Sequence, residues 1–394
     1  MSQRLINLNP DLKKMRDEGF EIAIVSNFLV MRNVPYVNSK QEVKLADLVS
    51  ELTLAGDKTT KPSTHVVHFT GEHPCDKNGA PLTKIVNATS ENRLAEGLIA
   101  RHSFSSKPKE GYSDYYTKMT AYVAMISSPA QAIEPKADAR TFAPVEADAE
   151  ESVFNYIDTA SSRAGIVKAT KKLELQKIAI VGVGGTGSYI LDFVAKTPVK
   201  EIHLYDADEF LSHNAFRAPG APTLEDLRKK PKKVEYFKAI YEHMHKGIVA
   251  HGYDIDHSTI DELRDMDFVF LSIHGGNEKE LIFKKLEEFG VPFVDVGMGL
   301  YFVEESCTLG GVLRVTTSTD YKREHAKNRV SFSGEGDRNN EYARNIQVAD
   351  LNALNATYAV IKWKKIFGFY LDLEKEHSSV YTLDGNKIDN DDKP

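Results

Sequence analysis

The sequence predicts an α/β protein in which a mostly parallel sheet, with helices on both faces, follows a smaller α+β domain. From Lys177 onward, short and almost continuously apolar segments alternate with segments of helical periodicity. This pattern is typical of parallel strands that helices cover on both faces. A glycine-rich loop joins the first of these strands to the first helix. Residues 1–128 instead combine short apolar runs with turn signals, as a small α+β domain does.

The predicted elements of the C-terminal part follow one another in a regular order. Strands are expected where apolar residues run together, and helices where apolar residues recur every three or four positions. A further strand is expected to add an antiparallel edge over 308–319, and the tail after Leu383 is expected to fray. The other predicted strands cover 177–182, 200–206, 248–255, 267–273 and 291–297, and the helices cover 188–196, 233–246, 278–289 and 350–367.

A change of composition marks the predicted domain boundary. Residues 129–151 are rich in proline, alanine and charged residues and lack a sustained apolar period. They are therefore interpreted as a linker. The expected organisation is an accessory α+β domain over 1–128, the linker over 129–151, and a second domain over 152–394.

Composition and charge exclude several classes of protein. The 394-residue chain is 41% hydrophobic and 27% charged, so it can bury cores of ordinary size. Its net charge of −7 argues against nucleic acid as the main partner. The apolar runs fall short of the ~18–20 residues of a membrane helix, and the start lacks a signal-peptide core, so we expect a cytoplasmic protein with no membrane partner. With two cysteines, Cys75 and Cys307, a disulfide framework and a four-cysteine zinc site are excluded.

The glycine-rich loop indicates a nucleotide site. Its glycines, Gly182, Gly184, Gly185 and Gly187, let the backbone turn tightly and approach phosphates at the N-terminus of the next helix. Asp206 ends the following strand, where a carboxylate can accept hydrogen bonds from ribose hydroxyls. These residues fit NAD and ATP equally well. A tight turn that binds no ligand is a third interpretation of the same loop.

Two cations that follow Asp206 favour ATP over NAD. A dinucleotide needs no further cation, because the loop already holds its pyrophosphate. A triphosphate under attack does need them, because charge develops on the leaving pyrophosphate. Arg217 and Lys233 are in place to supply that charge.

The succession of strand, GxGGxG loop, helix, strand, DxDxxxxxNxxR and Lys-Lys-Val resembles the ThiF/MoeB/ubiquitin-activating enzyme superfamily. The resemblance implies a Rossmann-like domain that adenylates, with ATP and Mg²⁺, the C-terminal glycine carboxylate of a ubiquitin-like or small carrier protein. It implies that the four glycines hold the phosphates, Asp206 holds the ribose, and Asp208 lies beside the nucleotide and its Mg²⁺. Asn214 and Arg217 would contact phosphate, and Lys233 would stabilise the transition state.

The resemblance covers about residues 155–370 and also concerns partners. Family members carry an arginine on a helix before the first strand, often donated across a dimer, and Arg163 is the candidate in this chain. A homodimer is therefore expected. Residues 74–76, 102–108 and 115–118 resemble the accessory domain of a bacterial ThiF-like subgroup whose members are associated with ubiquitin-like proteins.

Two positions depart from the family pattern. Where the family ends its fourth strand with a Mg²⁺-binding aspartate, this chain has His274, and Mg²⁺ prefers hard oxygen ligands to imidazole. Either Asp206, Asp208 or Asp295 supplies the metal contact, or adenylation is weak or lost. Thioester-forming members also carry a cysteine after the nucleotide fold. Cys307 is interpreted instead as a buried structural cysteine, because two nearby carboxylates would raise the pKa of its thiol.

Three functions therefore stay open. The first is an adenylyltransferase without a thioester cysteine, and the second is a catalytically impaired ThiF-like protein that binds nucleotide or a partner. The third is an NAD-dependent oxidoreductase, for which the sequence offers only scattered histidines as acid–base groups. Residues 331–338 are expected to form a loop that can cover a peptide in the active cleft.

Overall fold

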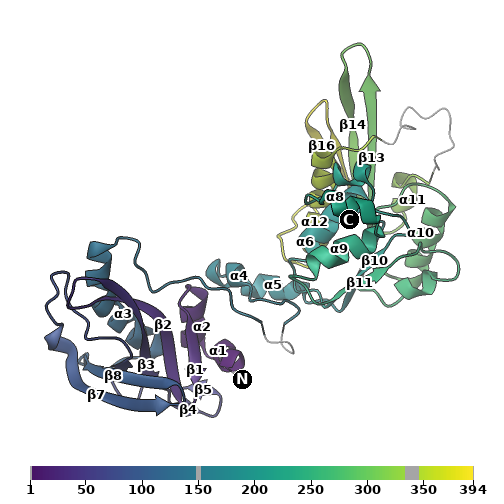
Figure 1. Cartoon of the computed structure of the whole chain (residues 1–394). Helices are drawn as coiled ribbons and strands as arrows, with labels where there is room; N and C mark the ends of the chain where they lie inside the picture. The colour runs from purple at the N-terminus through teal and green to yellow at the C-terminus, as the bar shows by residue number, and fades with distance from the viewer. Residues whose placement is uncertain (1, 148–151, 333–345, 394) are drawn as a thin grey trace. The chain divides into compact units, whose positions relative to one another are not determined.

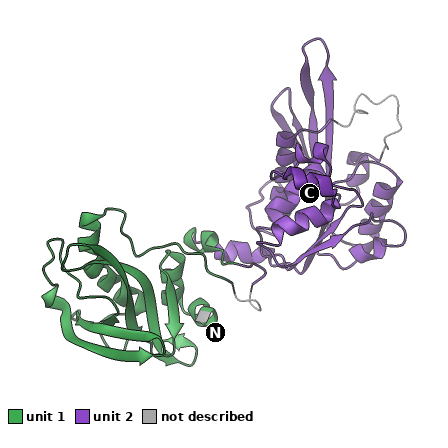
Figure 2. Ribbon diagram, viewed as in Figure 1, with its two compact units in different colours: residues 1–148, 156–164 green, residues 149–155, 165–394 purple. Residues whose placement is uncertain are grey.

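The computed structural model describes residues 2–147, 152–332 and 346–393. The chain folds into two compact units, shown in different colours in Figure 2: residues 1–148 with 156–164, and residues 149–155 with 165–394. The chain thus passes from one unit to the other three times. The division differs from the predicted boundaries, because helix α3 extends over Tyr115–Ile133 and Ala139 is buried in the core of the first unit.

The first unit is built on an antiparallel sheet with strand order β1-β2-β3-β6-β8-β7 (Figure 1). Helices α1 (Ser2–Leu8), α2 (Pro10–Asp17) and α3 accompany it. Their apolar side chains form one core that includes Leu29, Phe69, Phe104 and Tyr122. The strands are β1 (Ile22–Val25), β2 (Phe28–Val37), β3 (Val43–Glu51), β6 (Val66–Phe69), β7 (Val86–Ala95) and β8 (Leu98–Ser105), with a separate pair β4 (Leu54–Ala55) and β5 (Lys58–Thr59) and a 3-10 turn, η1 (Thr83–Ile85).

Lys118 on α3 is a buried lysine in the core of the first unit. Its side chain is 0% exposed, and its ammonium donates hydrogen bonds of 2.8 Å to Ser50 Oγ and to the Thr64 carbonyl oxygen. Burial disfavours the charged form and lowers the pKa of Lys118 from 10.5 to about 8. A charged core lysine therefore opposes folding at neutral pH.

The second unit is built on an eight-stranded mixed sheet with order β11-β10-β9-β12-β13-β14-β15-β16. The strands from β11 to β13 are parallel, and β14 to β16 continue the sheet in antiparallel fashion. The fold class predicted from the sequence is confirmed. The strands are β9 (Lys177–Val181), β10 (Glu201–Tyr205), β11 (Ile248–His251), β12 (Phe268–Leu271), β13 (Phe293–Val303), β14 (Thr308–Ser318), β15 (Ser378–Thr382) and β16 (Lys387–Asp391).

Helices cover both faces of the parallel part of this sheet. Ile178 and Ile180 of β9 join the core that contains Trp363 of α12 (Ala349–Ile366), together with side chains of α6 (Gly185–Val194) and α9 (Lys233–Tyr241). The alternate residues Ala179 and Val181 join a second core with α10 (Asn277–Phe289) and η3 (Ile260–Leu263). Successive side chains of a strand point to opposite faces, so β9 is buried on both.

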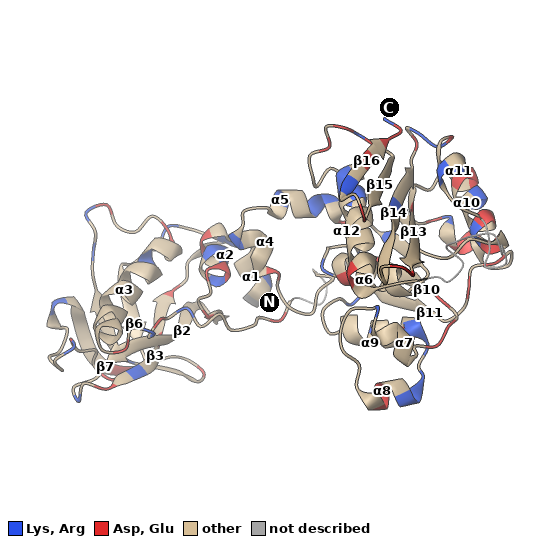
Figure 3. Cartoon of the chain, turned by 90° about the horizontal axis from the view of Figure 1, so that it is seen from above, with Lys and Arg blue, Asp and Glu red and all other residues tan. Residues whose placement is uncertain are grey.

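Short helices and surface pairs complete the second unit. Along α10, charges of both signs alternate on the outer surface (Figure 3), with ion pairs Lys284–Glu280 at 2.6 Å and Lys285–Glu288 at 2.7 Å. Within the residues that the structure describes, no helix combines the length and the apolar character needed to cross a membrane. The short elements are α5 (Val167–Thr170), η2 (Lys171–Leu173), α7 (Ser212–Ala215), α8 (Leu224–Lys229) and α11 (Ala326–Arg329), and α4 (Thr159–Arg163) belongs to the first unit.

Two sequence predictions are wrong. The C-terminal tail does not fray over its whole length, because Lys387–Asp391 forms strand β16 and pairs with β15. Cys307 is not buried: it lies exposed in the turn between β13 and β14, with φ +53. Strand β14 starts at Thr308, where the sequence predicted it, so the cysteine falls just outside the sheet.

We predict that Lys118→Met abolishes a pH dependence of stability. Between pH 8 and 10.5 the unfolded chain holds a proton that the folded chain lacks, so the stability of the wild type should rise with pH in this window. The rise should approach about 3 kcal/mol. Urea unfolding of the full chain at pH 7.5, 8.5 and 9.5 measures the difference between the two proteins. Equal slopes for wild type and variant would contradict the prediction.

Candidate nucleotide site

The glycine loop between β9 and α6 is shaped by close backbone contacts. Gly182 adopts φ +86, and a Cβ there would lie 2.7 Å from Ile273 Cγ2 and from the Ser272 carbonyl oxygen. A Cβ on Gly187 would overlap the Gly182 carbonyl oxygen. These two positions therefore admit only glycine, and they bring the start of α6 against the end of β9.

The N-terminus of α6 is open at Gly184. This residue is the N-cap and offers no side-chain cap, and a Cβ built on it would meet no heavy atom within 4 Å. The first amide groups of a helix have no partner inside the helix and attract anions. The start of α6 therefore has the open amides that a phosphate site needs, and the phosphate-binding role of the loop stays a prediction.

Asp206 connects the second strand to the loop. It follows β10 directly and is 7% exposed. One carboxylate oxygen accepts a 2.8 Å hydrogen bond from the Val183 amide, and the other accepts a 3.0 Å bond from the Asp208 amide. These bonds fix the carboxylate beside the loop, where it can face a ribose.

Lys233, the first residue of α9, forms ion pairs with both Asp206 and Asp208. Its ammonium lies 2.6 Å from Asp208 Oδ2 and 3.2 Å from Asp206 Oδ1. The hydrogen bond from Lys233 lowers the pKa of Asp208 below its usual range. The Lys233 side chain is 9% exposed whereas that of Asp208 is 75% exposed, so a buried ammonium is held by one buried and one accessible carboxylate.

Arg217 approaches the same site. Its Nε is buried and has no hydrogen-bond partner among the described residues. Burial lowers the pKa of Arg217, and the charge of Asp208 opposes that effect. Asn214 is 4% exposed, and its Oδ1 accepts a 2.8 Å bond from the Leu211 amide. Asn214 therefore shapes the turn of α7 that precedes Arg217.

Asn352 of α12 is a site residue that the sequence analysis missed. It is 0% exposed, accepts a 3.0 Å hydrogen bond from Thr186 Oγ1, and donates a 3.2 Å bond to the Arg217 carbonyl oxygen. A Cβ on Gly185 would overlap its side chain. The one signal in the sequence was an asparagine in a helix that is otherwise expected to pack apolar side chains against the sheet.

Of the three carboxylates that the sequence analysis proposed for Mg²⁺, Asp208 is exposed, whereas Asp206 and Asp295 are buried. Asp295 is 0% exposed and is held between Lys279 and Arg314, and these two cations oppose binding of a metal ion. His274 lies exposed after β12. Among the described residues, no group of three or more His, Cys, Asp or Glu side chains is arranged to hold a metal. Asp208 therefore fits best, because Mg²⁺ is often held by one or two carboxylates together with substrate phosphates.

One predicted site residue belongs to the first unit, and a predicted loop lies mostly outside the described residues. Arg163 is the last residue of α4 in the first unit, where its guanidinium lies 5.2 Å from the centre of the Phe142 ring. Its role at the nucleotide stays a prediction. Most of the loop expected over 331–338 lies outside the described residues.

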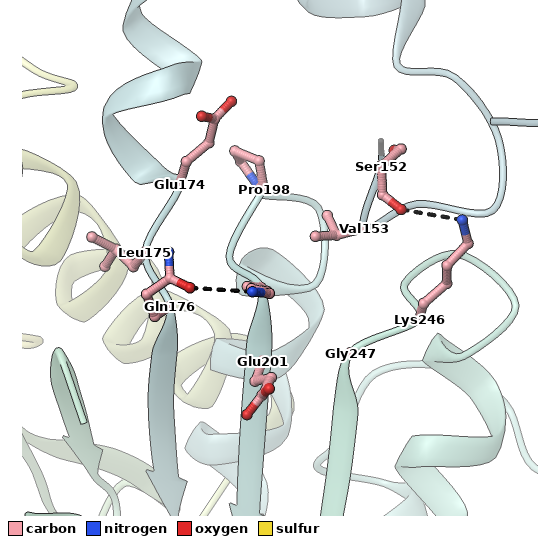
Figure 4. Close-up of a pocket in the computed structure, with 10 residues that line it drawn as sticks. Ser152, Val153, Glu174, Leu175, Gln176, Pro198, Glu201, Lys246 and Gly247 are labelled. Atoms are coloured by element: carbon pink, nitrogen blue, oxygen red, sulfur yellow. Dashed lines mark hydrogen bonds between the residues drawn. The ribbon is translucent and has the colours of Figure 1, made fainter. Parts of the chain in front are cut away.

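A surface depression lies at the opposite end of the sheet (Figure 4). It has a volume of about 460 Å³ and is lined by residues that precede β9, β10 and β11, including Gln176, Pro198 and Lys246. The Lys246 ammonium donates a 3.1 Å hydrogen bond to the Ser152 carbonyl oxygen there. Ligands of open parallel sheets bind at the carboxyl ends of the strands, so this depression is not part of the nucleotide site.

Fold and site together define a nucleotide-binding α/β domain. The model of the ThiF family matches residues 159–301, and that of a domain of unknown function, DUF6791, matches residues 10–159. The chain therefore contains a ThiF-family domain preceded by an extra N-terminal domain, which confirms the family predicted from the glycine loop and the residues after Asp206.

Solved structures with a similar fold include E. coli MccB and PaaA. The structure of E. coli MccB with ATP is 18% identical to this chain, with a TM-score of 0.43. The match covers 58% of this chain and 66% of the MccB chain, so this chain spans just under two thirds of that relative's length. A structure of SeMet PaaA is 16% identical, with a TM-score of 0.45 and coverage of 70% and 85%. A search of curated proteins gives no match.

We predict that alanine at two loop glycines has different effects. Gly187→Ala should lower stability by about 1–3 kcal/mol, because its Cβ would overlap the Gly182 carbonyl oxygen. Gly184→Ala should unfold near the wild-type temperature but bind ATP more weakly, because its methyl group would enter the open space at the start of α6. Differential scanning calorimetry and ATP titration separate the two effects. Unchanged ATP affinity in a folded Gly184→Ala protein would place the phosphates elsewhere.

Proposed function

We propose that this protein uses ATP to adenylate the C-terminal carboxylate of a ubiquitin-like or small carrier protein. The observation that carries the proposal is the buried Arg217 Nε, which has no hydrogen-bond partner in the described part of the chain. It lies next to the open glycine loop and to the ion pairs that Lys233 forms with Asp206 and Asp208. A guanidinium and an ammonium beside a helix N-terminus that can bind phosphate suit a triphosphate. The ThiF-family match over residues 159–301 supports the class of reaction.

The reaction needs little covalent participation by the protein. A carboxylate is already ionised at neutral pH, and one of its oxygens attacks the α-phosphorus of ATP. The bond from that phosphorus to the bridging oxygen breaks, and pyrophosphate leaves with the electron pair. The mixed anhydride that results keeps AMP in the site. Positioning of the two reactants and stabilisation of charge on the pyrophosphate supply the catalysis.

The side chains of the site have distinct tasks in this scheme. The amides at the start of α6 bind phosphate oxygens, and Asp206 accepts hydrogen bonds from the ribose. Lys233 exchanges its contact with Asp208 for one with phosphate, and the Arg217 guanidinium donates hydrogen bonds to the leaving pyrophosphate. Asn214 holds the turn that presents Arg217.

Magnesium belongs to the proposal through Asp208. Its carboxylate is exposed and becomes free when Lys233 turns to the phosphates. When bound, Mg²⁺ supplies additional neutralisation of phosphate charge.

The proposal extends to assembly. A homodimer is expected from the resemblance to the ThiF superfamily, and it would allow Arg163 of one copy to complete the site of another. The acyl partner ends in glycine in this scheme.

Two alternatives differ in what they require of the site. A binding protein without catalysis would keep the nucleotide loop, and His274 in place of a metal-binding carboxylate favours this alternative. An NAD-dependent oxidoreductase would leave Arg217 and Lys233 without a purpose, so we place it last.

We predict that Arg217→Ala and Lys233→Ala each lower ATP–pyrophosphate exchange by about 10²–10³-fold, because each removes a cation from the developing charge. The assay uses candidate small proteins that end in glycine. Lys229→Ala is the matched control, because Lys229 on α8 is 64% exposed and pairs only with Glu225 among the described residues. Exchange that persists in both variants, or that no candidate partner elicits in the wild type, would contradict the proposal.

A second test concerns His274. If its imidazole weakens Mg²⁺ binding, His274→Asp should raise Mg²⁺-dependent exchange about tenfold, since a carboxylate oxygen is a harder ligand. His274→Asn is the control that removes the imidazole without adding charge. Loss of existing exchange in His274→Asp would instead give the histidine a role of its own.

A further inference from the structure

Three charged side chains form a buried cluster at the carboxyl end of the sheet that the reaction scheme leaves unused. Asp295 of β13 is 0% exposed. Lys279 of α10 places its ammonium 2.6 Å from Asp295 Oδ1, and Arg314 of β14 places Nη2 2.5 Å from Asp295 Oδ2. We call these three residues the Asp295 triad.

The triad has two basic side chains for one carboxylate. Burial lowers the pKa of Lys279, so Arg314 is the permanently charged cation of the triad. Two cations share one carboxylate, and within the described ranges no second carboxylate forms an ion pair with Lys279 or Arg314. Glu280, which follows Lys279 in α10, pairs with Lys284 instead. A carboxylate or carbonyl oxygen that reached the Arg314 guanidinium would therefore gain a charge-assisted hydrogen bond.

Arg314 is the one residue of the triad that is partly exposed to solvent. Its side chain is 15% exposed, against 3% for Lys279 and 0% for Asp295. The guanidinium lies flat on β13, because a Cβ on Gly297 would be 2.7 Å from Nη2 and 3.3 Å from Cζ. Its Nη1 also donates a 2.8 Å bond to Thr316 Oγ1. A guanidinium has five N–H donors, so three remain after these two bonds.

The triad lies close to the nucleotide loop. Asp295 pairs with Leu271, the last residue of β12. The next residue, Ser272, donates a 2.6 Å hydrogen bond to the Gly182 carbonyl oxygen of the loop. Strands β9, β12 and β13 are neighbours in the sheet, so β13 lies about 10 Å from β9 at a spacing of about 4.8 Å per strand. The triad therefore lies two strands from the loop that is proposed to hold the phosphates.

We propose that Arg314, held by Asp295 and Lys279, binds the acyl end of the substrate. Its free N–H groups would donate to the carboxylate before the reaction and to the acyl carbonyl oxygen afterwards. The ligand class is an extended peptide C-terminus that ends in a glycine carboxylate. This inference rests on the proposed function, because it names the acyl subsite of the same reaction.

The experiment compares two ligands on the full-length protein by calorimetry. One is ATP, and the other is 5′-O-(N-glycylsulfamoyl)adenosine, a stable mimic of glycyl adenylate. Arg314→Gln should weaken binding of the mimic at least tenfold and leave ATP affinity within twofold of the wild type. The variant should stay folded, because Lys279 and Asp295 remain as a neutral pair. Arg314→Lys, which keeps the charge but loses the fixed planar donors, should show a smaller loss.

Arg323→Gln is the matched control. Arg323 follows β14 at the opposite end of the sheet, where its Nη2 pairs with Asp320 at 2.6 Å and bonds the Gly290 carbonyl oxygen at 2.8 Å. It should change the affinity for neither ligand. Unchanged affinity of Arg314→Gln for the mimic would overturn the inference, as would an equal loss for ATP. Failure of the wild type to bind ATP would overturn the proposed function instead.

Discussion

The close approach of α6 to the end of β9 is the constraint on which the nucleotide site depends. Without a side chain at Gly187, the helix can begin directly against the Gly182 carbonyl oxygen. The same contact leaves Gly184 at the helix N-terminus with open space beside it. Ser272 ties the loop to β12 by a hydrogen bond to that same carbonyl oxygen. The position of the helix dipole, and with it the phosphate site, is therefore set by backbone contact.

Charge at the carboxyl end of the sheet is organised so that each buried carboxylate already has a cation. Lys233 is shared between Asp206 and Asp208, and Lys279 and Arg314 share Asp295. In the first group the accessible Asp208 can release Lys233, whereas the second group has two basic side chains for one carboxylate. In the proposed reaction Lys233 moves to the phosphates when ATP binds, before the chemical step, so its charge is in place when the transition state forms.

Local patterns predicted much of the second unit. Strands β9, β10 and β12 and helices α6, α10 and α12 lie where the apolar periodicity places them, because residues buried on both faces leave a continuous apolar run. The sequence predicted the C-terminal tail and the ends of the strands less well. Strand β16 reads as a polar tail, since all of its residues are exposed, and it exists because β15 offers hydrogen-bond partners. The burial of Cys307 was also predicted wrongly, because in the sequence a turn residue next to an apolar strand cannot be told from a residue of that strand.

The sequence by itself indicated the glycine loop, the Asp206 carboxylate and the cations Arg217 and Lys233, because all of them lie within residues 182–233, one segment in which strands and helices alternate. Tertiary structure alone decided that Asn352 bridges Thr186 to the Arg217 segment. It also decided that Asp295 is enclosed by two cations from α10 and β14. Such contacts join segments far apart in the chain, and only the packing of the sheet and its helices brings them together.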